Sequence, residues 1–250
     1  MSPDPNQPAH FPVPSFLGIG AQKAGTTWLW ENLRIHPELF VPRRKELHYL
    51  DLHWDRGHDW YFQHFRPRRV RRRRPGEITP AYLVVPEDRI QGMHALNPDM
   101  RLILMIRNPI DRAWSAAKYF ARNQMKADVV DLPIEEFEAV ATTPLMLQRG
   151  DYLEGLRRWG SVFPDEQLLV VFHDEVVEDP VATIGRVFDH LQVPTPANLG
   201  GYPLRTVFNA GPSRGMTDAH RSILAPLFEA QIDGLRARFG DRQIPWLADA

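Results

Sequence analysis

The stretch GIGAQKAGTTWL, residues 18–29, is the strongest indication of the fold of this chain. The phosphate-binding loop of nucleotide triphosphatases reads GxxxxGK[ST], where the lysine reaches the outer phosphates and the hydroxyl group holds magnesium. Gly20 and Gly25 have that spacing, but Thr26 stands where the lysine would be, and Lys23 lies inside the loop instead. A cation at this place would meet a bound nucleotide from a different direction.

The flanking residues predict a strand before the loop and a helix after it. Residues 15–19 form a short apolar run, and residues 26–36 have the apolar spacing of a helix that ends at Pro37. A strand, a glycine loop and a helix N-terminus together bind anions through backbone N–H groups and the helix dipole. A glycine loop alone would fit an ordinary βα turn, but the strand and the helix favour an anion site.

Composition narrows the class of protein. The chain has 250 residues, which suits one α/β domain, and no cysteine, which excludes disulfides and thiolate zinc sites. A net charge of -1 argues against a general role at nucleic acids or membrane surfaces. Residues 1–14 are rich in proline and predict a disordered lead-in to a domain at 15–250. The chain contains no run of about 20 apolar residues, the length that is needed to cross a bilayer. We therefore expect a soluble, cytoplasmic protein.

The chain alternates strands and helices, which predicts a single α/β domain with a mostly parallel central sheet flanked by helices. The expected strands lie at 15–19, 77–79, 101–106 and 167–172. The expected helices lie at 26–36, 59–65, 86–96, 110–123, 145–159, 180–191 and 218–239. The polar segment 126–144 is expected to be a surface insertion.

A second anion site is predicted where the strand 101–106 ends. Arg107 follows that strand, and open α/β sheets bind ligands at the carboxyl ends of their strands. Ser115 lies on the next helix, which Pro109 opens. An arginine fork and a hydroxyl group suit a phosphate monoester. The alternative is that Arg107 pairs with a carboxylate and Ser115 is a small packing residue.

These motifs, in this order, resemble the sulfotransferases that use 3′-phosphoadenylyl sulfate (PAPS), and most of all their heparan sulfate branch with its bacterial relatives. Residues 46–51 (ELHYLD) match the branch pattern E-x-H-F-F-D, and residues 56–61 (RGHDWY) match G-x-x-W-Y. Residues 77–82 (EITPAY) resemble E-K-T-P-x-Y, and residues 107–115 supply R-N-P-x-x-R-A-x-S. The resemblance covers about residues 16–240 and implies the sulfotransferase fold with a P-loop-like nucleotide site.

The resemblance implies PAPS as sulfuryl donor and PAP as product, with no metal. Lys23 would meet the negative charge that builds on the bridging oxygen as the sulfuryl group leaves. Arg107 and Ser115 would hold the 3′-phosphate. The full set of donor-site residues implied is Lys23, Ala24, Gly25, Thr26, Thr27, Trp28, Arg107, Ser115, Tyr152, Arg214 and Gly215. For Tyr152, the edge of an amphipathic helix is an equally good interpretation.

The resemblance also implies an acceptor side. Glu46 matches the general base of the family, and His48 would lie on the same side if the segment is extended. Lys45, Asp51 and Thr79 are the expected acceptor-binding residues. From residue type alone, Glu46 could equally form a surface ion pair with a neighbouring cation, and His48 could be a packing residue. The branch has a lysine in E-K-T-P where this chain has Ile78, so a second cation must come from elsewhere, with Lys45 and Arg44 as candidates.

Two other features are weighed against this interpretation. The arginine run 66–74 could bind a polyanion, but its framing prolines favour a solvated loop. Histidines 48, 53, 58 and 64 lack the i, i+4 spacing of a zinc helix. We therefore expect an enzyme, a PAPS-dependent sulfotransferase that acts on a hydroxyl group of a sugar or glycan. The alternatives are a P-loop phosphotransferase and a non-enzymatic polyanion-binding module.

Overall fold

The computed structural model describes residues 12–66, 70, 72–208, 214–240, 244 and 246. Most of the expected lead-in, residues 1–11, and parts of the arginine run and of the segment before Arg214 therefore lie outside the described residues. A five-stranded sheet with the order β2-β3-β1-β4-β5 forms the centre, and every neighbouring pair in it is parallel. The strands are β1 (Phe16–Gly20), β2 (Leu39–Phe40), β3 (Arg74–Ile78), β4 (Arg101–Ile106) and β5 (Leu168–Phe172).

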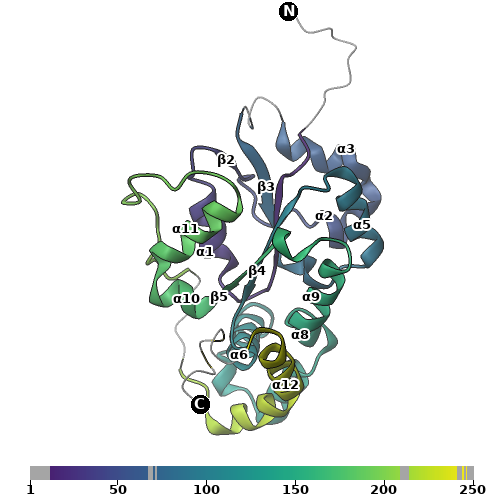
Figure 1. Cartoon of the computed structure of the whole chain (residues 1–250). Coiled ribbons are helices and arrows are strands. Elements are labelled where there is room, and N and C mark those ends of the chain that lie inside the picture. The colour runs from purple at the N-terminus through teal and green to yellow at the C-terminus, as the bar shows by residue number, and fades with distance from the viewer. Residues whose placement is uncertain are drawn as a thin grey trace, which may run out of the picture.

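Helices cover both faces of the sheet, as Figure 1 shows, with α1, α10 and α11 on one side and α5 and α9 on the other. The α-helices are α1 (Thr26–Leu33), α2 (Tyr49–Leu52), α3 (Gly57–Phe62), α5 (Glu87–Leu96), α6 (Pro109–Phe120), α7 (Ile134–Ala141), α8 (Pro144–Gln148), α9 (Tyr152–Gly160), α10 (His173–Glu178), α11 (Pro180–His190) and α12 (Asp218–Phe239). The prediction of a single α/β domain with a parallel sheet flanked by helices is confirmed.

The central strands are apolar because both of their faces are covered, as expected for parallel strands. All residues of β1 are buried, and so are the residues of β4 after Arg101. Gly18 is needed in β1 because a Cβ atom there would lie 2.7 Å from the Ile78 side chain on β3. The strand 101–106 and the helix 218–239 are found at the bounds that the sequence predicts.

The segment 126–144 is not a simple surface insertion, so that expectation was wrong. It contains α7, which packs with α6 and α12 around a second apolar cluster. Val129 and Phe137 are buried in this cluster together with Trp114 of α6 and Phe228 of α12. These helices lie beyond the carboxyl ends of the strands (Figure 1). The polar composition of the segment reflects the outer face of α7, because only one side of that helix is buried.

The helix expected at 145–159 is two helices. The break falls at Gly150, where a Cβ atom would lie 2.2 Å from Nε of the buried Arg112. Asp151 then starts α9, since its Oδ1 accepts from the Glu154 N–H at 3.1 Å. In the described part of the chain, no helix is long and apolar enough to span a membrane.

Candidate active site

The donor loop, residues 21–25, connects β1 to α1 at the carboxyl edge of the sheet. The N–H group of Ala21 donates to the Met105 carbonyl at 2.9 Å, which ties the loop to β4. Gly25 has φ 102°, a left-handed conformation that favours glycine. It caps α1 without a side-chain hydrogen bond, and the first turn of α1 has no acidic residue. The helix start therefore offers backbone N–H groups and the positive end of its dipole to an anion.

Lys23 lies in this loop with the left-handed φ of 70°, and its Nζ lies 4.6 Å from the ring centroid of Tyr119 on α6. The pKa of Lys23 is lowered to about 8, first by burial and then by the charges of neighbouring cations, which are Arg122, Arg107, Lys45 and Lys118. Cations gathered this closely repel one another, and a bound anion relieves that repulsion. The electrostatics therefore mark this edge of the sheet as an anion site.

Arg107 follows β4, and its backbone is fixed by Tyr152. The Tyr152 hydroxyl accepts from the Arg107 N–H at 3.3 Å and donates to the Arg107 carbonyl at 2.9 Å. Tyr152 is completely buried, and its hydroxyl group is engaged with the Arg107 backbone. Asn108 starts α6 by accepting from the N–H groups of the first turn, as the Asn-Pro pair predicts. Ser115 lies partly exposed on the same helix.

Besides Tyr152, three more residues expected at the nucleotide have buried side chains, namely Ala24, Thr26 and Trp28. The Trp28 indole N–H donates to the Leu204 carbonyl at 2.8 Å, which holds the segment before residue 209 against α1. In this structure the Trp28 side chain is thus engaged with Leu204. Thr27, by contrast, is partly exposed at the start of α1.

Arg214 and Gly215 are exposed, and the structure does not bring Arg214 to the donor loop. The Arg214 guanidinium pairs with Asp131 at 2.5 Å and with Asp128 at 3.7 Å, both in the segment before α7. Residues 209–213, which precede it in the expected closing loop, lie outside the described residues.

The acceptor-side segment, residues 45–51, carries a chain of alternating charges. Lys45 Nζ lies 2.5 Å from Glu46 Oε1, and His48 Nε2 lies 3.5 Å from Glu46 Oε2. On its other side, His48 Nδ1 lies 2.8 Å from Asp51 Oδ2. Glu46 and His48 both have left-handed backbone, with φ of 64° and 57°, so the segment is not the extended strand that the sequence interpretation assumed. The contacts bring together four residues expected at the acceptor side, Lys45, Glu46, His48 and Asp51.

These contacts set the charges of the segment. Burial alone would raise the pKa of Glu46, but the hydrogen bond from His48 and the charge of Lys45 outweigh it and lower that pKa to about 2. Hydrogen bonds to Asp51 and Glu46 raise the pKa of His48 to about 9. At neutral pH, Glu46 is therefore a carboxylate and His48 an imidazolium. An imidazolium has no lone pair with which to accept a proton, so His48 is a poor substitute for Glu46 as a base.

Sequence reasoning missed Glu77, which lies buried under this segment at the end of β3. Its carboxylate accepts from Thr79, Tyr82, Tyr61 and the Leu47 N–H. The sequence signal that could have indicated Glu77 was a glutamate among the buried residues of β3. Thr79, expected to bind the acceptor, is completely buried and its hydroxyl group donates to Glu77 at 2.6 Å. The Thr79 hydroxyl group is therefore engaged with Glu77, and its expected contact with an acceptor stays a prediction.

Ile78 is buried against Gly18 in the sheet and offers no charge to the site. Lys45 is the nearer of the two candidate replacements, since it contacts Glu46 and its charge acts on Lys23. Arg44 is exposed. Among the residues that the structure describes, no group of three or more His, Cys, Asp or Glu side chains is placed to hold a metal ion. His53 and His64 instead pack against the Trp60 ring.

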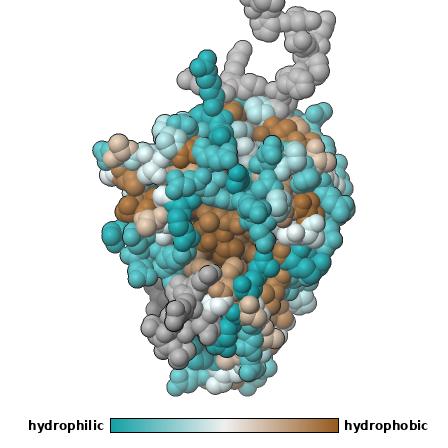
Figure 2. Space-filling view, viewed as in Figure 1, coloured by the Kyte–Doolittle hydropathy of each residue, from teal (hydrophilic) through white to brown (hydrophobic). Residues whose placement is uncertain are grey.

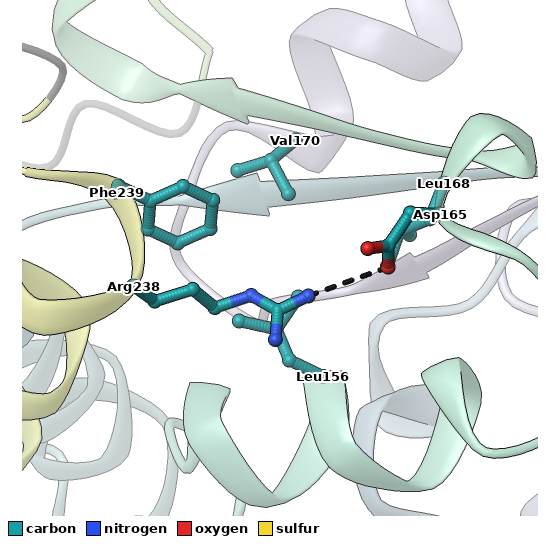
Figure 3. Close-up of a pocket in the computed structure, with 6 residues that line it drawn as sticks. All are labelled: Leu156, Asp165, Leu168, Val170, Arg238 and Phe239. Atoms are coloured by element: carbon teal, nitrogen blue, oxygen red, sulfur yellow. Dashed lines mark hydrogen bonds and ion pairs between the residues drawn. The ribbon is translucent and has the colours of Figure 1, made fainter.

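A cavity of about 490 Å³ with both apolar and charged lining lies elsewhere, beside β5. Leu156, Leu168, Val170 and Phe239 line it, and the Arg238–Asp165 ion pair of 3.5 Å crosses its mouth (Figure 3). Figure 2 shows apolar surface in a hollow at the middle of this face. The charged cluster lies at the carboxyl ends of the strands, so this cavity is no part of it.

The fold and the charged site suit a protein that binds an anionic ligand at the carboxyl edge of a parallel sheet, and the comparisons with known proteins give its family. The family model for the sulfotransferase domain matches residues 14–210. The human heparan sulfate glucosamine 3-O-sulfotransferase 6 is 34% identical over 187 residues, which are 71% of this chain and 52% of that protein. The chain belongs to the sulfotransferase family. It spans about half the length of the curated relatives that it matches.

Solved structures agree with this assignment. A sulfotransferase from Alicyclobacillus acidocaldarius has a TM-score of 0.69 and 26% identity, and the match covers 90% of this chain and 94% of that one. The mouse sulfotransferase SULT7A1, solved in complex with PAP, has a TM-score of 0.50 at 17% identity and covers 76% of this chain and 62% of its own. The second similarity supports the fold alone.

Proposed function

We propose that this protein transfers a sulfuryl group from PAPS to a hydroxyl group of a sugar or glycan, with Glu46 as the general base. The observation that carries the proposal is the pairing of two opposite charges across the site. The half-buried Lys23 lies within a cluster of cations, and the ionised Glu46 is connected to that cluster through Lys45. One end of the site thus suits a leaving phosphate and the other suits an acceptor hydroxyl.

The reaction breaks the S–O bond to the 5′-phosphate and forms an S–O bond to the acceptor oxygen. The electron pair of the broken bond stays on the phosphate oxygen, where the Lys23 ammonium group would stabilise it. The acceptor proton passes to the Glu46 carboxylate. Because the transfer needs positioning and charge stabilisation only, the residues present suffice for the proposed chemistry.

Glu46 has a low pKa in this structure because Lys45 and His48 contact it. A base is most effective when its pKa lies near the working pH. An acceptor hydroxyl that displaces Lys45 from Glu46 would raise the pKa of the carboxyl group and free the Lys45 ammonium for the sulfuryl oxygens. Lys45 would then supply the second cation that Ile78 cannot.

On the donor side, Arg107 and Ser115 would hold the 3′-phosphate of the nucleotide. Tyr152 fixes the backbone of Arg107 from the buried side. Thr26 and Thr27 would bind the 5′-phosphate through the N–H groups at the start of α1. Arg214 would have to leave Asp131 to contact the donor.

Two measurements test the proposal. Radiolabelled PAPS incubated with the protein and a panel of glycan acceptors should give a labelled glycan. Thermal unfolding should show stabilisation by PAP, since a ligand of the native state raises its free energy of unfolding. Stabilisation by ATP with magnesium instead would favour a phosphotransferase, and stabilisation by a glycan or nucleic acid alone would favour a polyanion-binding module.

A further inference from the structure

Glu77 is a buried carboxylate that accepts four hydrogen bonds. Thr79 Oγ1 and the Leu47 N–H donate to Oε2 at 2.6 and 3.3 Å. The hydroxyl groups of Tyr82 and Tyr61 donate to Oε1 at 2.6 and 2.9 Å. The Glu77 side chain is 1% exposed. Burying a charge costs free energy unless the charge is fully hydrogen-bonded. We therefore ask what the buried Glu77 carboxylate and its four donors do for the site.

The network holds a run of four consecutive backbone N–H groups, from residue 46 to residue 49. The Glu46 N–H donates to the Ile78 carbonyl at 3.2 Å, and the Leu47 N–H to Glu77. The next two donate to the Thr79 hydroxyl at 3.5 Å and to the Tyr82 hydroxyl at 2.8 Å. All four acceptors belong to residues 77–82, and two of them, Thr79 and Tyr82, are themselves oriented by Glu77.

The run that is held includes the strained part of the site. Glu46 and His48 have φ of 64° and 57°, which costs energy for residues other than glycine. Such a conformation persists only when its surroundings hold it. The Leu47 N–H, between the two strained residues, is the one that Glu77 takes directly.

We propose that Glu77 is the positioning residue of the acceptor side, which fixes the strained backbone at Glu46 and His48 so that the Glu46 carboxylate faces the acceptor. The proposal rests on the proposed function for its catalytic consequence. Its structural part, the fixed placement of His48 between Glu46 and Asp51, does not depend on any reaction.

The experiment compares Glu77→Gln with Thr79→Val, Tyr82→Phe and a matched control, Thr183→Val. Thr183 is another buried threonine, whose hydroxyl group bonds to the Glu175 carbonyl of α10 and to the Asp179 carbonyl just before α11. The readouts are kcat for sulfuryl transfer, PAP affinity by calorimetry, the melting temperature, and the His48 titration by NMR, assigned by the signal lost in His48→Asn.

We expect Glu77→Gln to lower kcat at least ~10-fold, because displacement of a reacting group by about 1 Å costs up to ~10²-fold. The PAP affinity should stay the same. The pKa of His48, raised to about 9 by its two carboxylate partners, should fall by at least about one unit as those contacts loosen. Thr79→Val and Tyr82→Phe should show the same changes to a smaller extent, and Thr183→Val should change the melting temperature only.

Each outcome decides one question. A Glu77→Gln protein whose kcat and His48 titration match those of Thr183→Val overturns the positioning role. If Glu77→Gln does not fold, Thr79→Val and Tyr82→Phe carry the same test, and normal values in both overturn it. If the unmodified protein transfers no sulfuryl group, the proposed function fails, while the His48 titration still decides whether Glu77 positions the segment.

Discussion

The donor loop and the acceptor-side segment lie at the same edge of the sheet but are held in different ways. The donor loop is placed by elements next to it in the sequence, since β1 precedes it and α1 follows it directly. The segment at residues 45–51 is placed by residues about 30 positions further along the chain, namely Glu77 at the end of β3 and Thr79 and Tyr82 just after it.

Because of this difference, the donor loop and the acceptor-side segment should respond differently to side-chain substitutions. Backbone N–H groups make up most of the anion site in the donor loop, so single side-chain changes there remove charge but not shape. The acceptor side depends on a buried polar network, where the loss of one partner leaves others unsatisfied. We therefore expect donor-side substitutions to act on chemistry or affinity, and substitutions around Glu77 to act on geometry.

The largest effect should come from Lys23→Ala. The loss of a cation that stabilises the charge on the leaving group costs ~10³-fold or more in related phosphoryl transfers, and we expect a kcat loss of that size. Lys126→Ala is the matched control, because Lys126 also has a left-handed backbone, with φ 58°, and lies outside the site. Equal kcat values for the two variants would remove Lys23 from the reaction.

Glu46→Gln should lower kcat by at least ~10²-fold, because it removes the basic carboxylate and keeps the shape of the side chain. The PAP affinity should be unchanged, as measured by calorimetry. Glu154→Gln is the control, since cationic partners also lower the pKa of Glu154 to about 2, but on α9 away from the site. Near-normal turnover of Glu46→Gln would contradict its role as base.

Arg107→Ala should weaken PAP binding by ~10- to 100-fold, as expected for the loss of a charged hydrogen bond to phosphate. It should also reduce the preference for PAP over AMP, because the two differ in the 3′-phosphate. Arg186→Ala, which breaks an exposed ion pair with Glu175, should leave both affinities unchanged. Equal binding of PAP and AMP to the unmodified protein would contradict the assignment of the 3′-phosphate site.

The affinity for PAP should fall roughly tenfold between about pH 8 and pH 9.5. The pKa of Lys23 is lowered to about 8 in the free protein, and a bound phosphate raises it by favouring the charged form. The complex therefore holds a proton that the free protein loses as the pH rises through 8, so binding weakens above that pH. Calorimetry across this range should show no such fall for Lys23→Ala, and a fall that persists in that variant would assign it to another group.

The smallest expected effect is that of EDTA, which should leave the transfer rate unchanged. The proposed chemistry places the charge of the leaving group on Lys23 and the phosphates on backbone N–H groups and Arg107, without a bridging cation. Sulfuryl transfer assayed with and without EDTA checks this. A strict requirement for magnesium would favour the phosphotransferase alternative.

The sequence by itself determined the donor side. The spacing of Gly20, Lys23 and Gly25 between an apolar strand and an amphipathic helix is local information, and the structure has a strand, loop and helix there. The strand 101–106 and the helix 218–239 were predictable for the same reason, because their hydrophobic pattern is a property of consecutive residues. Glu46, His48 and Asp51 were predicted because the motif at residues 46–51 resembles that of the family, and the spacing within a motif is also local information.

The contacts beneath these residues could not be predicted from the sequence and are seen only in the tertiary structure. Thr79 was expected as an acceptor contact and Tyr152 as a nucleotide contact, and the structure adds that their hydroxyl groups bond to Glu77 and to the Arg107 backbone. Two donors to Glu77, Thr79 and Tyr82, lie within the motif 77–82, but the other two, Tyr61 and the Leu47 N–H, come from 16 and 30 residues earlier in the chain. This polar network is closed by Leu47 and Tyr61, which meet Glu77 only after folding, so its full membership cannot be found from local pattern.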